Sequence, residues 1–217
     1  FLKQNPYYDH SVKPYPFDPE KAKQMLAEAG WTDTDGDGIL DHDLDGDGMR
    51  EPFEFNFMTI SSSANQRKYS TMVKEDMKRA GIAVNIKPLD WANYLQRLEE
   101  WSFDVCSLGW SGGALESDPN QIWHSRFADK KKSSNHVGYK SEEADALIER
   151  GRRTLDIEKR VEIFQRFHRL LHRDQPYTFL FVRPALVAQS RRYRNVRIYK
   201  TGMNTKLMWV PEALQVR

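Results

Sequence analysis

Apolar residues recur along the chain with two different spacings, and each spacing predicts one type of element. Helical spacing, with apolar residues three or four positions apart, is found in five segments: residues 18–29, 61–80, 90–98, 141–152 and 156–174. Strict alternation, which is typical of half-buried strands, is found from Phe53 to Met58 and from Ile82 to Lys87. A short apolar run from Phe103 to Leu108 predicts a third strand, and two more are expected at 177–182 and 186–188.

The order of these elements predicts the fold class. Strand, helix, strand, helix and strand follow one another between residues 53 and 108 with short links, which favours an α/β sheet with at least some parallel pairing. We therefore predict an α/β lobe over residues 18–189, with a mixed sheet flanked by helices. An extended arm is expected at 1–17 and a basic, irregular segment at 190–217, and no domain boundary is indicated within 18–189.

Residues typical of helix starts support these assignments. Asp18 and Pro19 fit the N-cap and the first helical position of one helix. Asp90 is expected to cap the helix that follows it, and Ser141 and Asp156 are expected to begin two more. Helix boundaries are therefore expected near these residues.

Composition excludes several classes of protein. The chain has 217 residues and a formal net charge of +2, so nothing indicates wholesale binding to nucleic acid or to a membrane surface. The single cysteine, Cys106, rules out an internal disulfide and is interpreted as a small core residue within the apolar run. No apolar stretch is long enough to span a bilayer. The first residues lack the apolar region of a signal peptide, so we expect the sequence to be part of a longer protein.

The segment from Phe103 to Ser125 is the main candidate for ligand binding. The predicted strand breaks at Gly109, and Trp110 and a glycine-rich loop follow. Loops at strand ends are where open α/β sheets bind ligands, and glycines allow the backbone to approach them. The candidate ligand-binding residues are Trp110, Ser111, Gly112, Gly113, Glu116 and Asp118. Spacing alone fits an ordinary surface loop equally well, with Trp110 in the core and Asp118 capping the next helix.

Acidic residues alternate with other residues between Trp31 and Glu54, and Asp-Gly pairs recur about ten residues apart. One set matches the pattern of a calcium-binding loop: Asp43, Asp45, Asp47, Gly48 and Glu54. An overlapping set supplies further ligands: Asp33, Asp35, Asp37, Gly38 and Asp41. Pro52 and the strand-like pattern after it argue against the exit helix of an EF-hand. The sequence therefore predicts either a Ca²⁺ site or a solvated acidic hairpin with Asp-Gly turns.

No set of residues indicates catalysis. The chain lacks a Gly-x-Ser-x-Gly motif, a phosphate-binding loop and a dinucleotide fingerprint. His168 and His172 have a spacing that can hold zinc, but His168 shares the apolar face of its helix, which favours a core histidine. We predict that the protein is not an enzyme, with a hydrolase using Glu116 and Asp118 as a less favoured alternative.

Several short segments, in this order, resemble the family 5 extracellular solute-binding proteins, the peptide-binding components of ABC importers. The segments that carry the resemblance are residues 15–31, 35–38, 89–91, 103–104, 108–110, 117–119, 123–125, 141–145 and 174–176. The resemblance covers nearly the whole chain and is that of the C-terminal portion of such a protein.

The resemblance implies one lobe of a periplasmic-binding-protein-like fold that closes on a second, N-terminal lobe around a solute, expected to be a peptide. It also implies an ABC permease as partner and a periplasmic or extracellular location. In peptide-binding relatives, an acid in the loop after Gly-Trp pairs with the ligand's α-amino group. Here Gly113 to Leu115 contain no acid, and Glu116 or Asp118 can take that role. A calcium-dependent interaction module built on residues 33–54 is the alternative function.

Overall fold

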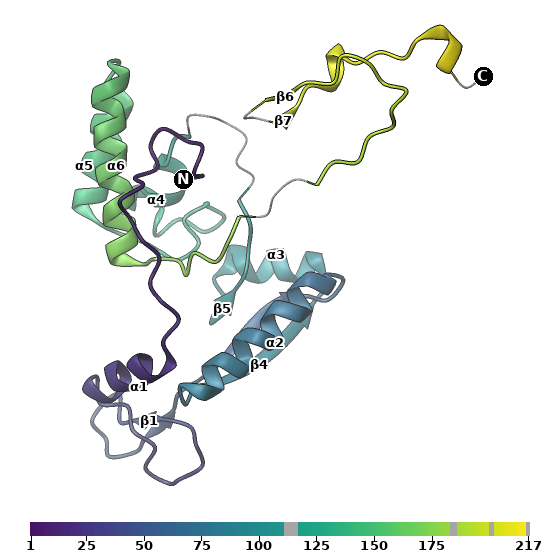
Figure 1. Cartoon of the computed structure of the whole chain (residues 1–217). Helices are drawn as coiled ribbons and strands as arrows, with labels where there is room; N and C mark the ends of the chain where they lie inside the picture. Colours follow the sequence, from purple (N-terminus) through teal and green to yellow (C-terminus); the bar gives the residue numbers. More distant parts are fainter. Residues whose placement is uncertain (111–116, 183–185, 200–201, 216–217) are drawn as a thin grey trace. The chain divides into compact units, whose positions relative to one another are not determined.

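The computed structural model describes residues 1–110, 117–182, 186–199 and 202–215 of the chain. The elements are α1 (Pro19–Glu28), β1 (Asp41–His42), β2 (Glu51–Pro52), β3 (Glu54–Ile60), α2 (Ala64–Arg79), β4 (Ala83–Leu89), α3 (Trp91–Glu100), β5 (Val105–Cys106), α4 (Asn120–Trp123), η1 (Ser125–Phe127), α5 (Glu142–Arg153), α6 (Ile157–Asp174), β6 (Ile198–Tyr199), β7 (Gly202–Met203), η2 (Thr205–Leu207) and η3 (Glu212–Leu214) (Figure 1).

The chain forms two compact units. Unit 1 contains Phe1–Lys13, Trp110–Asp129 and Val137–Arg217, and unit 2 contains Pro14–Gly109 and Lys130–His136. The boundaries expected from the sequence, 1–17, 18–189 and 190–217, group the residues differently and stay a prediction.

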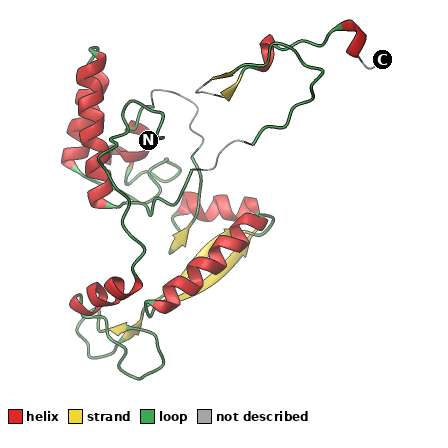
Figure 2. Ribbon diagram, viewed as in Figure 1, coloured by secondary structure: helices red, strands yellow, loops and turns green. Residues whose placement is uncertain are grey.

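Unit 2 is built on a three-stranded parallel sheet in the order β4-β3-β5, which confirms the α/β class. Strands β3 and β4 pair along their full length, from Glu54 with Ala83 to Ile60 with Leu89. The two connections cross the sheet in opposite directions, so right-handed crossovers put α2 and α3 on opposite faces. Figure 2 shows α2 lying along the strands. The expected mixed sheet is instead all parallel, and the antiparallel strand pairs in the described residues are the separate hairpins β1–β2 and β6–β7.

The third strand is shorter than predicted, because side chains take the place of ladder hydrogen bonds at both of its ends. Only Val105 and Cys106 pair with β3. Before them, the Asp104 carboxylate accepts the backbone N–H of Asn56 at 2.9 Å. After them, the backbone groups of Ser107 bind side chains of α2 and α3 rather than a neighbouring strand.

The predicted helix starts are confirmed by side chains that cap the first turns. The pairs of N-cap acceptor and backbone donor are Asp18 with Lys21, Ser63 with Gln66, Asp90 with Asn93, Ser141 with Ala144, and Asp156 with Lys159. Four large apolar residues that the helical pattern predicts to face the core do not: Met25 is 59% exposed, Met72 66%, Trp91 51% and Ile157 61%. Trp91 and Ile157 are the first residues of α3 and α6.

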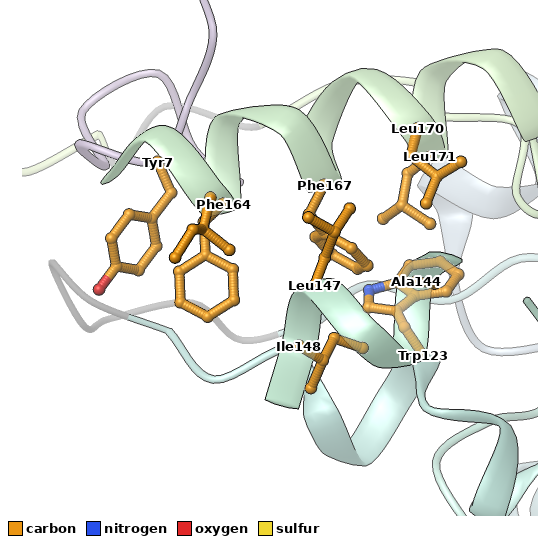
Figure 3. Close-up of a cluster of buried hydrophobic side chains, with 10 residues drawn as sticks. Tyr7, Trp123, Ala144, Leu147, Ile148, Phe164, Phe167, Leu170 and Leu171 are labelled. Carbon is orange, nitrogen blue, oxygen red and sulfur yellow. The ribbon is translucent and has the colours of Figure 1, made fainter. Parts of the chain in front are cut away.

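The core of unit 1 lies between α5 and α6 (Figure 3). Its buried residues are Tyr7, Trp123, Ala144, Leu147, Ile148, Ile163, Phe164, Phe167, Leu170 and Leu171. The two helices approach closely at Gly151, where an added Cβ would lie 2.4 Å from the Phe164 ring. A side chain at this position would force the helices apart.

The strands expected at 177–182 and 186–188 are absent, so this prediction was wrong for the described residues. The segment is extended and strongly apolar, and Val182 and Leu186 are 68% and 94% exposed. A strand forms only where a neighbour supplies ladder hydrogen bonds, and the described residues offer none here. Residues 183–185 lie outside the described part of the chain.

Candidate functional site

Three side chains converge on Ser107 at the carboxyl edge of the sheet in unit 2. The Tyr94 hydroxyl donates to the Ser107 carbonyl at 2.8 Å and accepts from its N–H at 3.2 Å. Gln66 Nε2 also donates to that carbonyl at 3.1 Å, and the Tyr69 hydroxyl lies 2.7 Å from Ser107 Oγ. We call Gln66, Tyr69, Tyr94 and Ser107 the Ser107 clamp. Because Tyr69 is on α2 and Tyr94 is on α3, the clamp ties both helix layers to the end of β5.

The clamp also ties two strand ends together. Gln66 Oε1 accepts the backbone N–H of Ile60, the last residue of β3, while its Nε2 binds Ser107 just after β5. The hydrogen-bond ladder between β3 and β4 continues one residue beyond β3, because Ser61 N donates to Leu89 O at 2.8 Å. The carboxyl edge of the sheet is therefore fixed where ligands bind in open α/β sheets.

Burial keeps the clamp uncharged. Tyr94 is fully buried, and burial raises the pKa of its hydroxyl, so the group remains protonated and can both donate and accept. Burial also raises the pKa of the neighbouring Cys106 thiol. Since the thiolate is the reactive form of cysteine, Cys106 is a packing residue at neutral pH.

The predicted binding loop begins directly after the clamp. Leu108 is 40% exposed and Trp110 is 49% exposed, so neither side chain belongs to the core. The sequence allowed Trp110 to lie either in the core or at the surface of a binding loop, and its exposure excludes the core. Four of the other candidate residues lie outside the described part of the chain, namely Ser111, Gly112, Gly113 and Glu116.

Asp118 makes two contacts within unit 1. Its Oδ1 accepts the backbone N–H of Asn120, the first residue of α4, at 3.0 Å, and its Oδ2 lies 3.1 Å from Arg152 Nε. The N-cap position of α4 is Pro119, and no side chain makes a cap hydrogen bond there, so the capping role considered for Asp118 is not what the structure has. A role in binding a ligand amine stays a prediction for both Asp118 and Glu116.

The acidic segment forms two loops with the same internal hydrogen bonds. Asp33 accepts the N–H groups of Gly36 and Gly38 at 2.8 and 3.0 Å. Ten residues later, Asp43 accepts those of Gly46 and Gly48 at 2.7 and 3.0 Å. In each loop three carboxylates lie within 4.8 Å of one another: Asp33, Asp35 and Asp37, and Asp43, Asp45 and Asp47.

Two of the eight predicted metal ligands belong to neither cluster. Asp41 accepts from Thr34 and pairs with Arg50, and the hydrogen bond from Arg50 contributes most to lowering the Asp41 pKa. Glu54 lies on β3, where its carboxylate accepts from Asn85 at 3.4 Å. The twelve-residue pattern assumed a continuous loop, whereas the pairing of β1 with β2 closes a hairpin before Glu54. No exit helix follows, as expected from the sequence, and Ca²⁺ binding stays a prediction.

Sequence reasoning missed the clamp. Tyr69 and Tyr94 fit the helical spacing of residues 61–80 and 90–98 and lie on the inward faces of their helices, but the partners of their hydroxyl groups are not visible in a helical pattern. Gln66 and Ser107 gave no signal at all, because they become important only once α2, α3 and β5 are in place.

The sequence pattern of the bacterial extracellular solute-binding proteins, family 5 Middle, matches residues 1–133. The oligopeptide-binding protein AppA of Bacillus subtilis is 35% identical over 80% of this chain and 31% of its own length. The haem-binding protein A of Haemophilus influenzae is 25% identical over 78% of this chain and 28% of its own length. The structure of B. subtilis AppA in complex with a nonapeptide covers 95% of this chain and 40% of its own, with a TM-score of 0.76 and 29% identity.

The chain thus spans about a third of the length of the curated relatives it matches. No helix in the described part of the chain is long and apolar enough to cross a membrane.

Proposed function

The chain belongs to the bacterial extracellular solute-binding proteins of family 5, and on this premise we propose that it is part of a receptor that binds a peptide and delivers it to an ABC importer. The observation that carries the proposal is the similarity of nearly the whole chain to AppA, whose structure was solved with a nonapeptide. Peptide binding is favoured over haem binding because the identity to AppA is higher than that to the haem-binding protein.

In this proposal the Ser107 clamp is the rigid support of the binding loop. Because both backbone groups of Ser107 are held, the chain leaves the sheet in one direction toward Gly109 and Trp110. Trp110 supplies an apolar surface for the ligand. The backbone of residues 111–114 supplies polar contacts, and Glu116 or Asp118 supplies a partner for the peptide amine.

The remaining partners follow from the same premise. The N-terminal lobe of the complete protein closes over the ligand by a hinge motion, and an ABC permease receives the closed receptor. The protein acts outside the cytoplasmic membrane, in the periplasm or at the cell surface. The ligand is released chemically unchanged, since the family consists of solute-binding proteins.

The test is a calorimetric titration of the complete protein with peptides of increasing length, with oligosaccharides and haem as comparison ligands. Peptide binding is expected, and the Trp110→Ala variant is expected to bind about tenfold more weakly, because an aromatic contact is lost. Trp209→Ala is the matched control, since Trp209 is 56% exposed and Trp110 is 49% exposed. If only a sugar or haem binds, the proposed peptide ligand is wrong and that solute is the ligand. If the two variants weaken binding equally, Trp110 is not part of the binding site.

The two alternatives receive no comparable support. A hydrolase would use Glu116 and Asp118, but the Asp118 carboxylate is already paired with Arg152. A calcium-dependent interaction module would need partner capture that EDTA abolishes, and the acidic loops are tested for Ca²⁺ below.

A further inference from the structure

A polar hollow of about 320 Å³ opens on unit 1 beside α4, η1 and the last turns of α5. Its lining consists of Asn120, His124, Arg126, Glu149, Arg152 and Arg153. Asn120 and His124 are its buried part, with only 7% and 8% of their surfaces exposed. Three guanidinium groups and one carboxylate line the hollow, so its lining carries a net positive charge.

Two of the three arginines are already paired with carboxylates. Arg152 Nε lies 3.1 Å from Asp118 Oδ2, and Arg153 Nη2 lies 3.2 Å from Glu149 Oε2. The other oxygen of Glu149 lies 3.5 Å from His124 Nε2, so both oxygens of this carboxylate have partners. The one acid in the lining is therefore occupied.

Arg126 differs from the other two arginines. Its Nη2 donates to Asn120 Oδ1 at 2.8 Å, and its guanidinium lies 4.8 Å from the centre of the Phe127 ring. Its backbone N–H donates to His124 Nδ1 at 3.2 Å, which fixes the start of the side chain. In the described part of the chain, no carboxylate neutralises Arg126.

The contact with Arg126 also sets the orientation of the Asn120 amide. A guanidinium can only donate hydrogen bonds, so the Asn120 atom that faces it must be the oxygen. The Nδ2 group then has both of its N–H bonds available, and it has no hydrogen-bond partner among the residues that the structure describes. Since Asn120 is more than nine-tenths buried and lines the hollow, this donor is held in place before any ligand arrives.

We propose that this hollow binds a small oxyanion, a carboxylate or phosphate group, through the Arg126 guanidinium and the Asn120 amide. A planar guanidinium presents paired N–H donors that match two oxygens of such a group, and an uncompensated cation gains most from an anionic ligand. The hollow adjoins one residue assigned to solute binding, because Asp118 pairs with Arg152 and accepts the backbone N–H of Asn120. Binding of a free ion can be tested without a peptide, whereas binding of a solute carboxylate rests on the proposed function. The oxyanion is either a free ion or a carboxylate carried by a bound solute.

The experiment is a titration of the complete protein with sodium phosphate and with sodium acetate, at an ionic strength kept constant with chloride. Saturable binding is expected for at least one of the two anions. Arg126→Gln is expected to weaken it about tenfold or more, because a charge-assisted contact is lost. Arg150→Gln is the matched control: it removes the same charge from α5, but Arg150 does not line the hollow, and a change of less than about twofold is expected.

A second variant separates loss of the site from loss of folding. Asn120→Asp gives Arg126 the carboxylate it lacks, so the melting temperature is expected to be kept or raised while anion binding is lost. Absence of anion binding in the unmodified protein, or equal effects of Arg126→Gln and Arg150→Gln, would overturn the proposal. Unchanged anion binding in Asn120→Asp would do the same.

The source of the oxyanion is distinguished with a peptide that binds and with its C-terminal amide. If Arg126→Gln weakens only the peptide with a free carboxylate, the solute itself supplies the group. If both peptides bind the variant as they bind the unmodified protein while phosphate or acetate binding is lost, the ligand is a free ion. Failure of all peptides to bind would contradict the proposed function and leave the anion titration unaffected.

Discussion

The two ends of β3 carry the polar clusters of unit 2, and they are built in opposite ways. At the amino end, the acidic loops hold themselves, with hydrogen bonds between residues two to five positions apart. At the carboxyl end, the Ser107 clamp joins groups that are 13, 38 and 41 positions apart in the chain. The first cluster consists of carboxylates that are exposed, except for the half-buried Asp43, and the second consists of uncharged groups that are fully or partly buried.

The range of these contacts along the chain determines how each cluster depends on the fold. A cluster held by neighbouring residues can form early and respond to ions without disturbing the core, since its contacts stay within one loop. A cluster held by two helices and two strands exists only in the folded sheet, and it fixes Ser107 within unit 2. The following tests separate these two kinds of construction.

Removal of the Tyr94 hydroxyl is expected to have the largest effect. Tyr94→Phe leaves the Ser107 N–H and one carbonyl bond unsatisfied in a partly buried site, which is expected to lower the free energy of unfolding by about 2 kcal/mol. Urea denaturation measures this change, and ligand titration is expected to show weaker binding as well. An unchanged midpoint together with unchanged affinity would mean that the clamp supports neither the fold nor the loop.

Calcium is expected to stabilise only the acidic loops at the amino end of β3. If the two carboxylate clusters bind Ca²⁺, a concentration ten times the dissociation constant raises the free energy of unfolding by about 1.4 kcal/mol per site, and EDTA reverses the effect. Thermal denaturation with and without Ca²⁺ measures it, and Mg²⁺ at equal concentration is the control. No shift in the melting temperature with either ion would remove the metal site from both loops.

Loss of the Tyr69 hydroxyl is expected to affect binding more than stability. Tyr69→Phe removes one bond to the Ser107 side chain, so the free energy of unfolding is expected to fall by about 1 kcal/mol. The comparison variant is Tyr139→Phe, which removes a hydroxyl that bonds to Asp174 and to Ser141 in unit 1. We expect the two variants to lose similar stability, with weaker ligand binding only in Tyr69→Phe; equal affinities would show that Ser107 Oγ needs no support.

Low pH is expected to destabilise the acidic segment at the amino end of β3 and to leave the Ser107 clamp intact. The Asp41 pKa is lowered from its usual value of 3.8, first by Arg50, so the stabilisation from this carboxylate is fully present above about pH 4. It is lost as the pH falls further, through the lowered pKa of the folded state. Asp41→Asn is expected to reduce this acid dependence, which denaturation at several pH values measures. An unchanged pH dependence in the variant would show that other carboxylates govern it.

Local features of the fold were predictable because their causes lie within a few residues. Asp18, Ser141 and Asp156 cap the helices that they were expected to begin, since an N-cap binds a backbone group only three residues away. Strand pairing was less predictable. The alternation at Phe53 to Met58 located β3, whereas the equally apolar segment at 177–182 forms no strand among the described residues. Apolar character indicates that a segment tends to be buried, but it does not specify which strand the segment pairs with.

The sequence by itself determined the family, the order of helices and strands between residues 53 and 106, and the two acidic loops. The helices, strands and loops depend on residues close together in the chain, and the family depends on short segments spread along it. Only the tertiary structure decided that Gln66, Tyr69 and Tyr94 meet at Ser107. It likewise separated Asp41 from the acidic cluster and left Arg126 beside an amide rather than an acid. These contacts join distant segments, and their partners are set by where the packed helices and strands place each side chain.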